Sequence, residues 1–378
     1  MNRRWMFVLM LVCALVLVMP RAWAQRPPDT DPPTGVITQD IVMSWDRSAM
    51  PGDIEIWAPK TLIAYDRDPA KMYGLLYFTC TSRTDSKSGR CPEQDTGEAS
   101  IRGGIIHLQF VESRGGQRAE LNIDAAVYRA DSTAACTTEF WSSTRYAMWS
   151  SYGAFCDWKE PAGTGADLHL FGSQLERLTA GHWVGTLELD LRDPSGRYIA
   201  RYIFNFDFQV TDYDAISIYF PTFDTVAPLV NLDLRYDPIQ KVVGGRKQLD
   251  MCLYDGLGSQ SEYLDVTVRD SGPRPPAGSD FSLWHRDGGS DASQRLDYRV
   301  HLDYGGHRLA MKHNVKQQLR GIDSAQLRLV MLPGISQPVY CVPTPLTLET
   351  PPTPIASQRP GLYEGELTVV LDVPTAKP

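Results

Sequence analysis

The chain has 378 residues, and its 37 basic and 45 acidic side chains give a formal net charge of −8 at pH 7. Such an acidic surface argues against nucleic acid as a partner, because the phosphates would be repelled. The length exceeds what one hydrophobic core usually serves, so we expect two domains.

The first 24 residues predict a secretory signal peptide. Arginines precede an apolar run over residues 5–19, and Ala-Trp-Ala at 22–24 places small residues where signal peptidase cleaves. A transmembrane anchor is the competing interpretation, but a span needs about 20 apolar residues and this run is shorter. We expect cleavage after Ala24 and export, which takes the formal charge from −8 to −11 because three arginines and no acids are removed.

Residues 25–35, QRPPDTDPPTG, have a different composition from the rest of the chain. They contain four prolines and no apolar alternation, so they lack the N–H groups that a strand ladder requires. We expect an extended, solvated leader here.

Six cysteines remain after cleavage, and an even number in an exported chain predicts disulfides. Chain order favours three sequential pairs among the 15 connectivities that six cysteines allow: Cys80–Cys91, Cys136–Cys156 and Cys252–Cys341. A zinc site is the alternative, but the chain has no CxxC pair and its seven histidines are dispersed. We therefore expect no metal and no cofactor.

Nearly every patterned stretch alternates apolar and polar residues, and Gly, Pro, Asp and Ser turns separate the stretches. The predicted strands are 105–112, 119–128, 185–193, 202–210, 229–237, 296–303 and 325–332. One short helix is expected over 173–181. The pattern predicts an all-β protein of two antiparallel β-sandwich modules stacked end to end. A fresh strand begins at residue 215, which places a short linker at 212–214.

Aromatic residues are concentrated between the third and fourth of the six cysteines and just beyond them. They are Phe140, Trp141, Tyr146, Trp149, Tyr152, Phe155 and Trp158. Exposed rings beside Arg145 would suit sugars, whose C–H faces stack on aromatic faces. Buried rings would instead fill the core, which is the more frequent fate of large aromatics. Both interpretations stay open for Trp141 and Trp149.

The segment 361–374, GLYEGELTVVLDVP, alternates from end to end and predicts a half-buried strand. Its inward face includes Leu367, Val369 and Leu371. A strand needs hydrogen-bonding neighbours, and here the chain has only four further residues. An ordinary edge strand is one explanation, and a partner from another chain is the other.

Enzyme motifs are weak. HRDGG at 285–289 is similar to a kinase catalytic loop, but no glycine-rich loop or strand lysine accompanies it, so a hairpin turn is expected. GxSxG, HExxH and P-loop patterns are absent. A secreted glycosidase with two distant carboxylates remains the enzymatic alternative.

Several stretches together resemble the CblD/CfaE-like tip subunits of class 5 chaperone–usher pili, which are minor pilins, adhesins and pilus initiators. They are residues 78–91, 210–223, 249–256, 285–298, 335–343 and the closing YEGELTVVLDVP. The resemblance covers most of the exported chain and is strongest after about residue 185. It implies two immunoglobulin-like domains, an adhesin domain at 36–211 and a pilin domain at 215–378. It also strengthens the pairing of Cys252 with Cys341.

In this family the pilin domain lacks its last strand. The resemblance implies that a periplasmic chaperone fills the gap first and that the N-terminal extension of the next pilin replaces it at the outer-membrane usher. Leu367, Val369 and Leu371 would line this donor-strand groove. A shaft subunit must also donate a strand, whereas the Pro-rich start of this chain is unsuited to do so. We therefore expect a fimbrial tip adhesin on the cell surface, without catalysis or cofactor.

The expected receptor of the N-terminal domain is a host or surface glycan. Enteric members of the family use arginines for acidic glycans, but the position after LELDLR reads Asp193-Pro194 here. Arg192 and Arg197 remain nearby and suit a carboxylated sugar, although both are also consistent with solvated surface charge. An initiator whose upper domain binds no receptor is the alternative.

Overall fold

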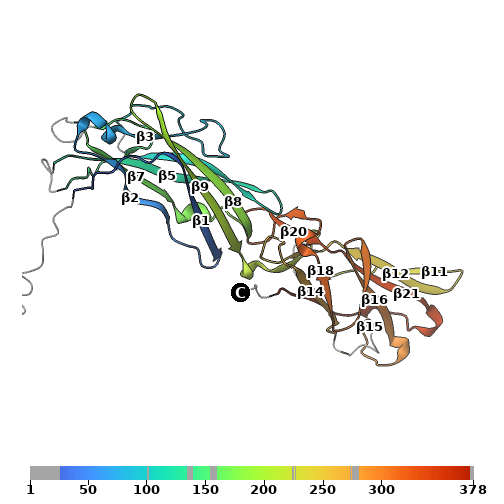
Figure 1. Ribbon diagram of the computed structural model, residues 1–378. Coiled ribbons are helices and arrows are strands. Elements are labelled where there is room, and N and C mark those ends of the chain that lie inside the picture. Colours follow the sequence, from blue (N-terminus) through green and yellow to red (C-terminus); the bar gives the residue numbers. More distant parts are fainter. Residues whose placement is uncertain are drawn as a thin grey trace, which may run out of the picture.

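The computed structural model describes residues 26–99, 102–133, 139–153, 160–223, 225, 227–272, 274 and 281–374. The molecule is elongated, with two β domains joined end to end (Figure 1). This confirms the predicted all-β, two-domain architecture. Within these ranges, no helix is long and apolar enough to cross a bilayer. The predicted signal peptide, residues 1–24, lies outside them.

The N-terminal domain is built on one sheet with the order β1-β9-β8-β4-β5-β7-β2, while β3 pairs with β8 and β6 with β5. The strands are β1 (Gly35–Asp46), β2 (Ile54–Tyr65), β3 (Tyr77–Cys80), β4 (Gly104–Glu112), β5 (Arg118–Ala130), β6 (Tyr146–Ala147), β7 (Gly163–Leu170), β8 (Gly181–Arg192) and β9 (Tyr198–Thr211). Its short helical elements are η1 (Pro69–Lys71), η2 (Tyr73–Leu75) and α2 (Gly172–Leu175). The pair β1–β9 is parallel, whereas β8–β9 and β4–β5 are antiparallel.

This sheet folds over on itself to enclose the core. Trp57 of β2, at one end of the strand order, contacts Tyr202 and Phe204 of β9, with ring centroids 4.9 and 5.1 Å apart. In β9, alternate residues from Phe204 to Val210 are buried, as expected when one face of a strand packs on a core. The two ends of the sheet therefore form opposed layers.

The C-terminal domain contains three smaller sheets with the orders β10-β13-β20-β19, β11-β12-β21-β16-β15-β22 and β18-β14-β23, and β17 pairs with β16. The strands are β10 (Ser217–Tyr219), β11 (Arg235–Asp237), β12 (Val242–Leu249), β13 (Cys252–Tyr254), β14 (Tyr263–Asp270), β15 (Phe281–His285), β16 (Arg295–Tyr304), β17 (His307–Met311), β18 (Val315–Arg320), β19 (Arg328–Val330), β20 (Val339–Pro343), β21 (Leu346–Pro354), β22 (Tyr363–Glu364) and β23 (Leu367–Asp372). Short 3-10 turns follow at η5 (Ala292–Gln294), η6 (Ile322–Ser324) and η7 (Ile355–Ser357).

Two predicted strands are shorter than the alternation indicated. Of residues 229–237 only the last three form a strand, and of 325–332 only three residues do. Asp233 has a φ of +52°, which breaks the extended conformation. The backbone near it crosses β12 at Gly245, where a Cβ would lie 2.7 Å from the carbonyl oxygen of Leu232. This stretch therefore passes over the sheet instead of pairing within it.

Two of the three predicted disulfides are confirmed. Cys80–Cys91 joins residues 11 apart in sequence and Cys252–Cys341 joins residues 89 apart. The second bridge links β13 to β20 at the end of the C-terminal domain that faces the first domain. Cys136 and Cys156 lie outside the described residues.

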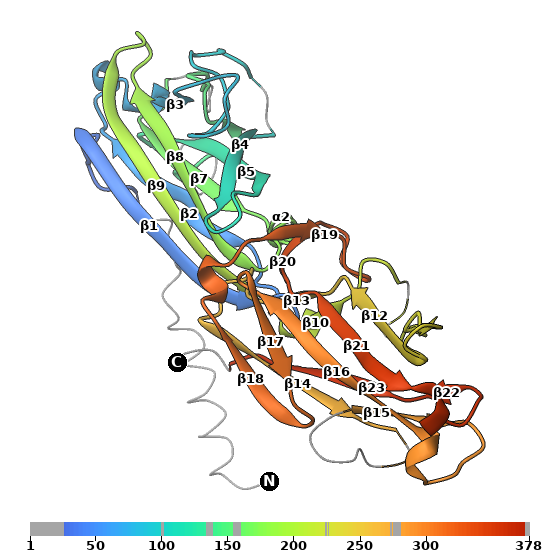
Figure 2. The same cartoon turned by 90° about the vertical axis from the view of Figure 1, so that its right-hand side faces the viewer.

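The two domains meet through a hairpin tip as well as through the linker, where η4 (Tyr213–Ala215) lies. The guanidinium of Arg114, in the β4–β5 turn, donates to the carbonyl of Ala325 beyond η6. The buried Glu112 carboxylate accepts a hydrogen bond of 3.1 Å from Gln260 Nε2, just before β14 begins. Figure 2 shows the β4–β5 end of the first domain above β20 and β19 of the second.

Asp46, the last residue of β1, fastens the linker to the first domain. Its carboxylate accepts hydrogen bonds from the hydroxyls of Ser48 and Thr211, at 2.6 and 2.7 Å, and from the N–H of Tyr213 at 3.2 Å. Burial would raise the pKa of Asp46, but these hydrogen bonds outweigh it and lower the pKa to about 2.

The Pro-rich leader is docked rather than solvated over its described part, which corrects the sequence-based expectation. Thr30 exchanges two backbone hydrogen bonds with Tyr65, at 2.8 and 2.9 Å. Asp31 accepts a hydrogen bond of 2.7 Å from the Tyr73 hydroxyl, and Pro27 is buried. Prolines flank the stretch Asp29–Asp31 but leave the N–H of Thr30 free to pair, so a single ladder position suffices to hold the leader on the domain.

Candidate functional site

The C-terminal segment divides its pairing between two sheets. Its first part, β22, pairs with β15, whereas β23 pairs with β14. The alternation had predicted one continuous strand, and the break occurs at Gly365, where a Cβ would lie 3.1 Å from the carbonyl oxygen of Ser282. The chain passes so close to β15 at this point that only glycine fits without displacement.

One edge of β23 is open. Six residues of β23 pair with β14, from Leu367 opposite Asp270 to Asp372 opposite Asp265. The order β18-β14-β23 places β23 at the end of its sheet, and its second edge has no strand partner among the described residues. An open edge presents unpaired N–H and C=O groups to any further strand.

Apolar side chains line the inner side of this edge. Leu367, Val369, Leu371 and Val373 are half-buried and pack against the core of the C-terminal domain. On the outer side, Asp372 forms an ion pair with Lys316 at 3.0 Å. The three predicted groove residues therefore share one face of β23, and that face is apolar but incompletely covered.

Other half-buried side chains on the same core were not predicted as part of the groove. They are Ile218, Phe220, Phe223, Val230 and Leu232, from the segment that follows the linker. The sequence contained a signal, because Val230 and Leu232 alternate with polar residues, but this alternation was interpreted as a paired strand. Residues 228–234 in fact form no ladder.

The aromatic residues of the upper domain are largely packed. Tyr146 is buried, and Phe140, Trp141, Trp149 and Tyr152 are half-buried. Trp149 covers Gly104 and Trp141 covers Gly165, where added Cβ atoms would meet the indole rings at 2.3 and 2.7 Å. Phe155 and Trp158 lie outside the described residues. The described rings thus cover strands rather than presenting free stacking faces.

A fully buried arginine, which the sequence did not single out, holds this aromatic segment in place. Arg129 donates to the carbonyl oxygens of Leu76, Ser150 and Tyr152 at 2.8, 2.7 and 3.1 Å, and to the Thr164 hydroxyl at 2.7 Å. Burial lowers the pKa of Arg129 to about 9.

Arg145 is engaged by acidic groups of its own domain. Its guanidinium forms ion pairs with the buried carboxylates of Asp124 and Asp167, the second at 2.9 Å. His169 also lies near both, at 3.6 and 3.2 Å. The two carboxylates and the imidazole lie close enough together to hold a cation. The arginine already supplies the positive charge there.

The other two predicted arginines lie at the end of the β8–β9 hairpin. Arg192 contacts the Asp190 carboxylate at 3.2 Å and the Thr79 hydroxyl at 3.1 Å. Arg197 pairs with Asp193 at 2.9 Å and its side chain is 77% exposed. Of the predicted receptor residues, Arg197 is therefore the one with a largely free surface.

Strand β3 lies between these two groups of candidates. The N–H of Phe78 donates to the carbonyl of Met148 at 2.8 Å, while Tyr77 pairs with Arg192 on β8. The aromatic segment and the β8–β9 hairpin therefore lie on either side of β3. No hydrogen bond or ion pair joins Arg145 to Arg192 or Arg197 in the described part of the chain.

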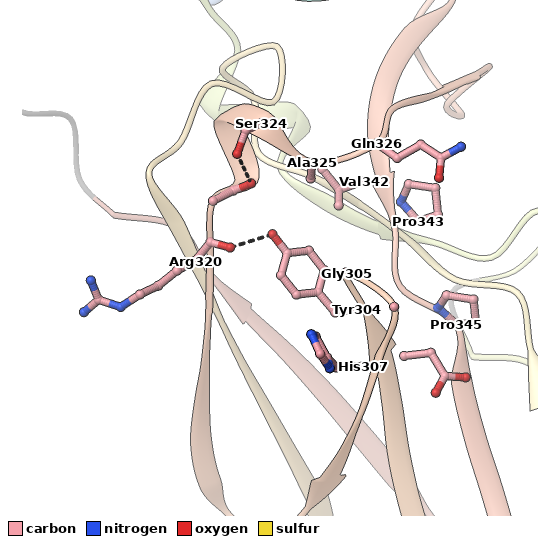
Figure 3. Close-up of a pocket in the computed structure, with 13 residues that line it drawn as sticks. Tyr304, Gly305, His307, Arg320, Ser324, Ala325, Gln326, Val342, Pro343 and Pro345 are labelled. Atoms are coloured by element: carbon pink, nitrogen blue, oxygen red, sulfur yellow. Dashed lines mark hydrogen bonds between the residues drawn. The ribbon is translucent and has the colours of Figure 1, made fainter.

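A hollow of about 610 Å³ lies on the C-terminal domain between the β16–β17 turn, the end of β18 and β20. Figure 3 shows the Tyr304 hydroxyl bonded to the carbonyl of Arg320, whose guanidinium points away from the hollow. Backbone, glycine and proline form much of the remaining wall. The hollow therefore offers few side-chain groups to a ligand.

A β domain with an apolar core that is open along one strand edge belongs to the class of proteins completed by a strand from another chain. The family model for the second domain of CfaE, a CFA/I fimbrial protein, matches residues 216–375, and the model for its first domain matches residues 20–213. The chain therefore belongs to the CfaE family of CFA/I fimbrial proteins, which confirms the resemblance seen in the sequence.

Individual relatives agree with this assignment. The CFA/I fimbrial protein of this family from Escherichia coli is 28% identical over 308 residues, which cover 79% of this chain and 80% of the relative. The crystal structure of CfaE, the adhesive subunit of CFA/I fimbria of enterotoxigenic Escherichia coli, superposes with a TM-score of 0.70 at 24% identity, over 93% of this chain and 95% of that one. A chaperone–tip adhesin complex matches with a TM-score of 0.65 at 23% identity and covers 93% and 99% of the two chains.

Proposed function

We propose that this protein is a fimbrial tip adhesin that starts pilus assembly, with its C-terminal domain accepting a strand from another subunit. The observation that carries the proposal is the open edge of β23 above half-buried Leu367, Val369 and Leu371. An incoming strand would pair with that edge and place its own apolar side chains on the core. Ile218, Phe220 and Val230 supply further apolar contacts for it.

The partners follow from this role. A periplasmic chaperone supplies the first strand, the outer-membrane usher is the site of exchange, and the major pilin supplies the permanent strand. The docked leader supports a terminal position in the fibre, because residues held by Tyr65 and Tyr73 are not free to enter a neighbour's groove. The exported protein is displayed at the fimbrial tip on the cell surface.

The role requires no catalysis and no cofactor. It assigns residues 36–211 to the adhesin domain, 212–214 to the linker and 215–378 to the pilin domain. Within the adhesin domain, Arg197 is the favoured receptor contact because its guanidinium is the most exposed of the predicted set. Arg192, Arg145, Trp141 and Trp149 would act chiefly by supporting that surface.

The strand-accepting role is tested by fusing the N-terminal extension of the cognate major pilin, through a flexible linker, after Pro378. We expect the fused chain to stay monomeric and to unfold at a temperature at least ~10 °C above that of the unfused chain, since a bound strand stabilises the fold that binds it. A scrambled extension of the same composition is the control. Equal melting temperatures for the two fusions would contradict the proposal.

Receptor binding needs a separate test, because an initiator without a receptor would pass the first one. A glycan array probed with the strand-complemented protein and with Arg197→Ala separates the two roles. Loss of the signal in the variant supports a receptor site at the β8–β9 hairpin. An array without any signal favours the initiator, and hydrolysis of an arrayed sugar would favour the glycosidase alternative.

A further inference from the structure

An apolar projection lies at the pole of the C-terminal domain that is farthest from the adhesin domain. The β11–β12 hairpin extends there beside the end of β21, at the right of Figure 1. Ile239, in the hairpin turn, is 91% exposed, and Ile355, in η7, is 44% exposed. We call these two side chains, with Pro238 and Pro354 beside them, the far-pole patch.

The hairpin turn is held rigidly. The carboxylate of Asp237 accepts hydrogen bonds from the N–H groups of Ile239 and Gln240, at 2.8 and 3.1 Å. Aspartate commonly fixes turns in this way, and the backbone is thereby ordered before any partner arrives. The exposed isoleucine side chain is therefore presented on a preformed turn.

The second isoleucine is fastened to the same turn. The N–H of Ile355 donates to the carbonyl of Lys241 at 3.0 Å, and the neighbouring residues Val242 and Pro354 are paired across β12 and β21. Isolated exposed apolar residues are ordinary on protein surfaces. Two isoleucines on adjoining rigid turns, with prolines beside them, instead form a small preformed apolar surface.

The direction of β23 indicates which molecule meets this surface. Its last residue, Asp372, pairs with Asp265 near the domain junction, whereas Leu367 pairs with Asp270 toward the far pole. Because the adhesin domain occupies the junction, the body of a subunit whose extension fills the groove must lie beyond the far pole. This step rests on the proposed strand-accepting function.

We infer that the far-pole patch is a second contact for the donating pilin, made by its globular body rather than by its extension. Arg235 and Lys241 are exposed beside the isoleucines, so the matching surface is an apolar hollow with acidic groups at its margin. The extension then supplies most of the affinity. The patch slows dissociation and fixes the angle between the two subunits.

The test compares the intact major pilin with a synthetic peptide of its N-terminal extension, each bound to the full exported chain. We expect the intact pilin to dissociate about tenfold more slowly than the peptide, the scale expected for burying one isoleucine. Ile239→Asp and Ile355→Asp should remove that difference and leave peptide dissociation unchanged. Leu329→Asp is the matched control, because Leu329 is 51% exposed on β19 of the same domain, near the junction.

The outcomes separate this inference from the strand-accepting function. Unchanged dissociation of the intact pilin in Ile239→Asp overturns the far-pole contact while peptide uptake still supports the groove. Failure of the unaltered chain to take up the peptide overturns the groove. If the intact pilin still binds in that case, and does so only with Ile239 in place, the patch is supported by itself. Binding of neither ligand refutes both.

Discussion

Arginine at position 369 should act on strand uptake far more than on the stability of the unoccupied chain. Val369 lies opposite the fully buried Val268 of β14 and is itself half-buried. In the unoccupied chain, a long arginine side chain reaches water past the open edge of β23, so Val369→Arg costs about 1 kcal/mol of lost apolar burial. The domain should therefore fold.

A donor strand on that edge closes the route to water. The guanidinium is then enclosed against an apolar wall without a counter-charge, which costs about 3–5 kcal/mol. At about 1.4 kcal/mol per tenfold, donor affinity should fall by a factor of about 10² to 10³. Titration with a synthetic extension of the cognate pilin, followed by the rise in melting temperature, measures this loss.

The same substitution one residue further along is the control. Val370 faces away from the core, opposite Thr267, so Val370→Arg places an equal charge on the outer face of the same strand. We expect its donor affinity to stay within about threefold of the unaltered chain, because a charge that remains in water costs little. Comparable losses in both variants, or none in Val369→Arg, would refute an inward-facing groove at β23.

Three further predictions concern the domains themselves. Arg129→Ala removes four hydrogen bonds from a fully buried group and should lower the free energy of unfolding of the adhesin domain by about 3–4 kcal/mol in urea titrations, with faster proteolysis of residues 139–153. Replacing Cys252–Cys341 by alanines opens an 89-residue loop and should cost about 4–5 kcal/mol, against about 3 kcal/mol for the 11-residue loop of Cys80–Cys91, as compared by thermal unfolding. Because the pKa of Asp46 is lowered from 3.8 to about 2, its contribution to stability is complete above about pH 4 and is lost as the pH falls toward 2; Asp46→Asn should flatten the unfolding profile in that window.

The sequence was most informative where one face of a strand packs on a core. The runs that became β4, β8, β9 and β16 were predicted within a few residues, because alternation reports directly on which side chains face inward. The groove side chains of β23 were predicted for the same reason. Alternation does not report on partners, so the change of sheet at Gly365 was not visible: it depends on how closely the chain passes β15.

Contacts between distant segments were likewise beyond the reach of local pattern. Arg145 is 21 and 22 residues from its partners Asp124 and Asp167, and the contact exists because β5 and β7 pair with Ala126 opposite Asp167. Only that register brings the two carboxylates together. The docking of the leader depends on a single backbone pairing with Tyr65, which composition could not indicate.

The lengthwise course of β23 also bears on how the tip would withstand tension. A strand paired with its free edge lies along the direction in which a tethered fibre is pulled. Traction along that line strains every rung of the six-residue ladder together, whereas a sideways pull would peel the rungs apart in turn. The joint between tip and shaft is therefore oriented for shear, the geometry in which a short ladder resists rupture best.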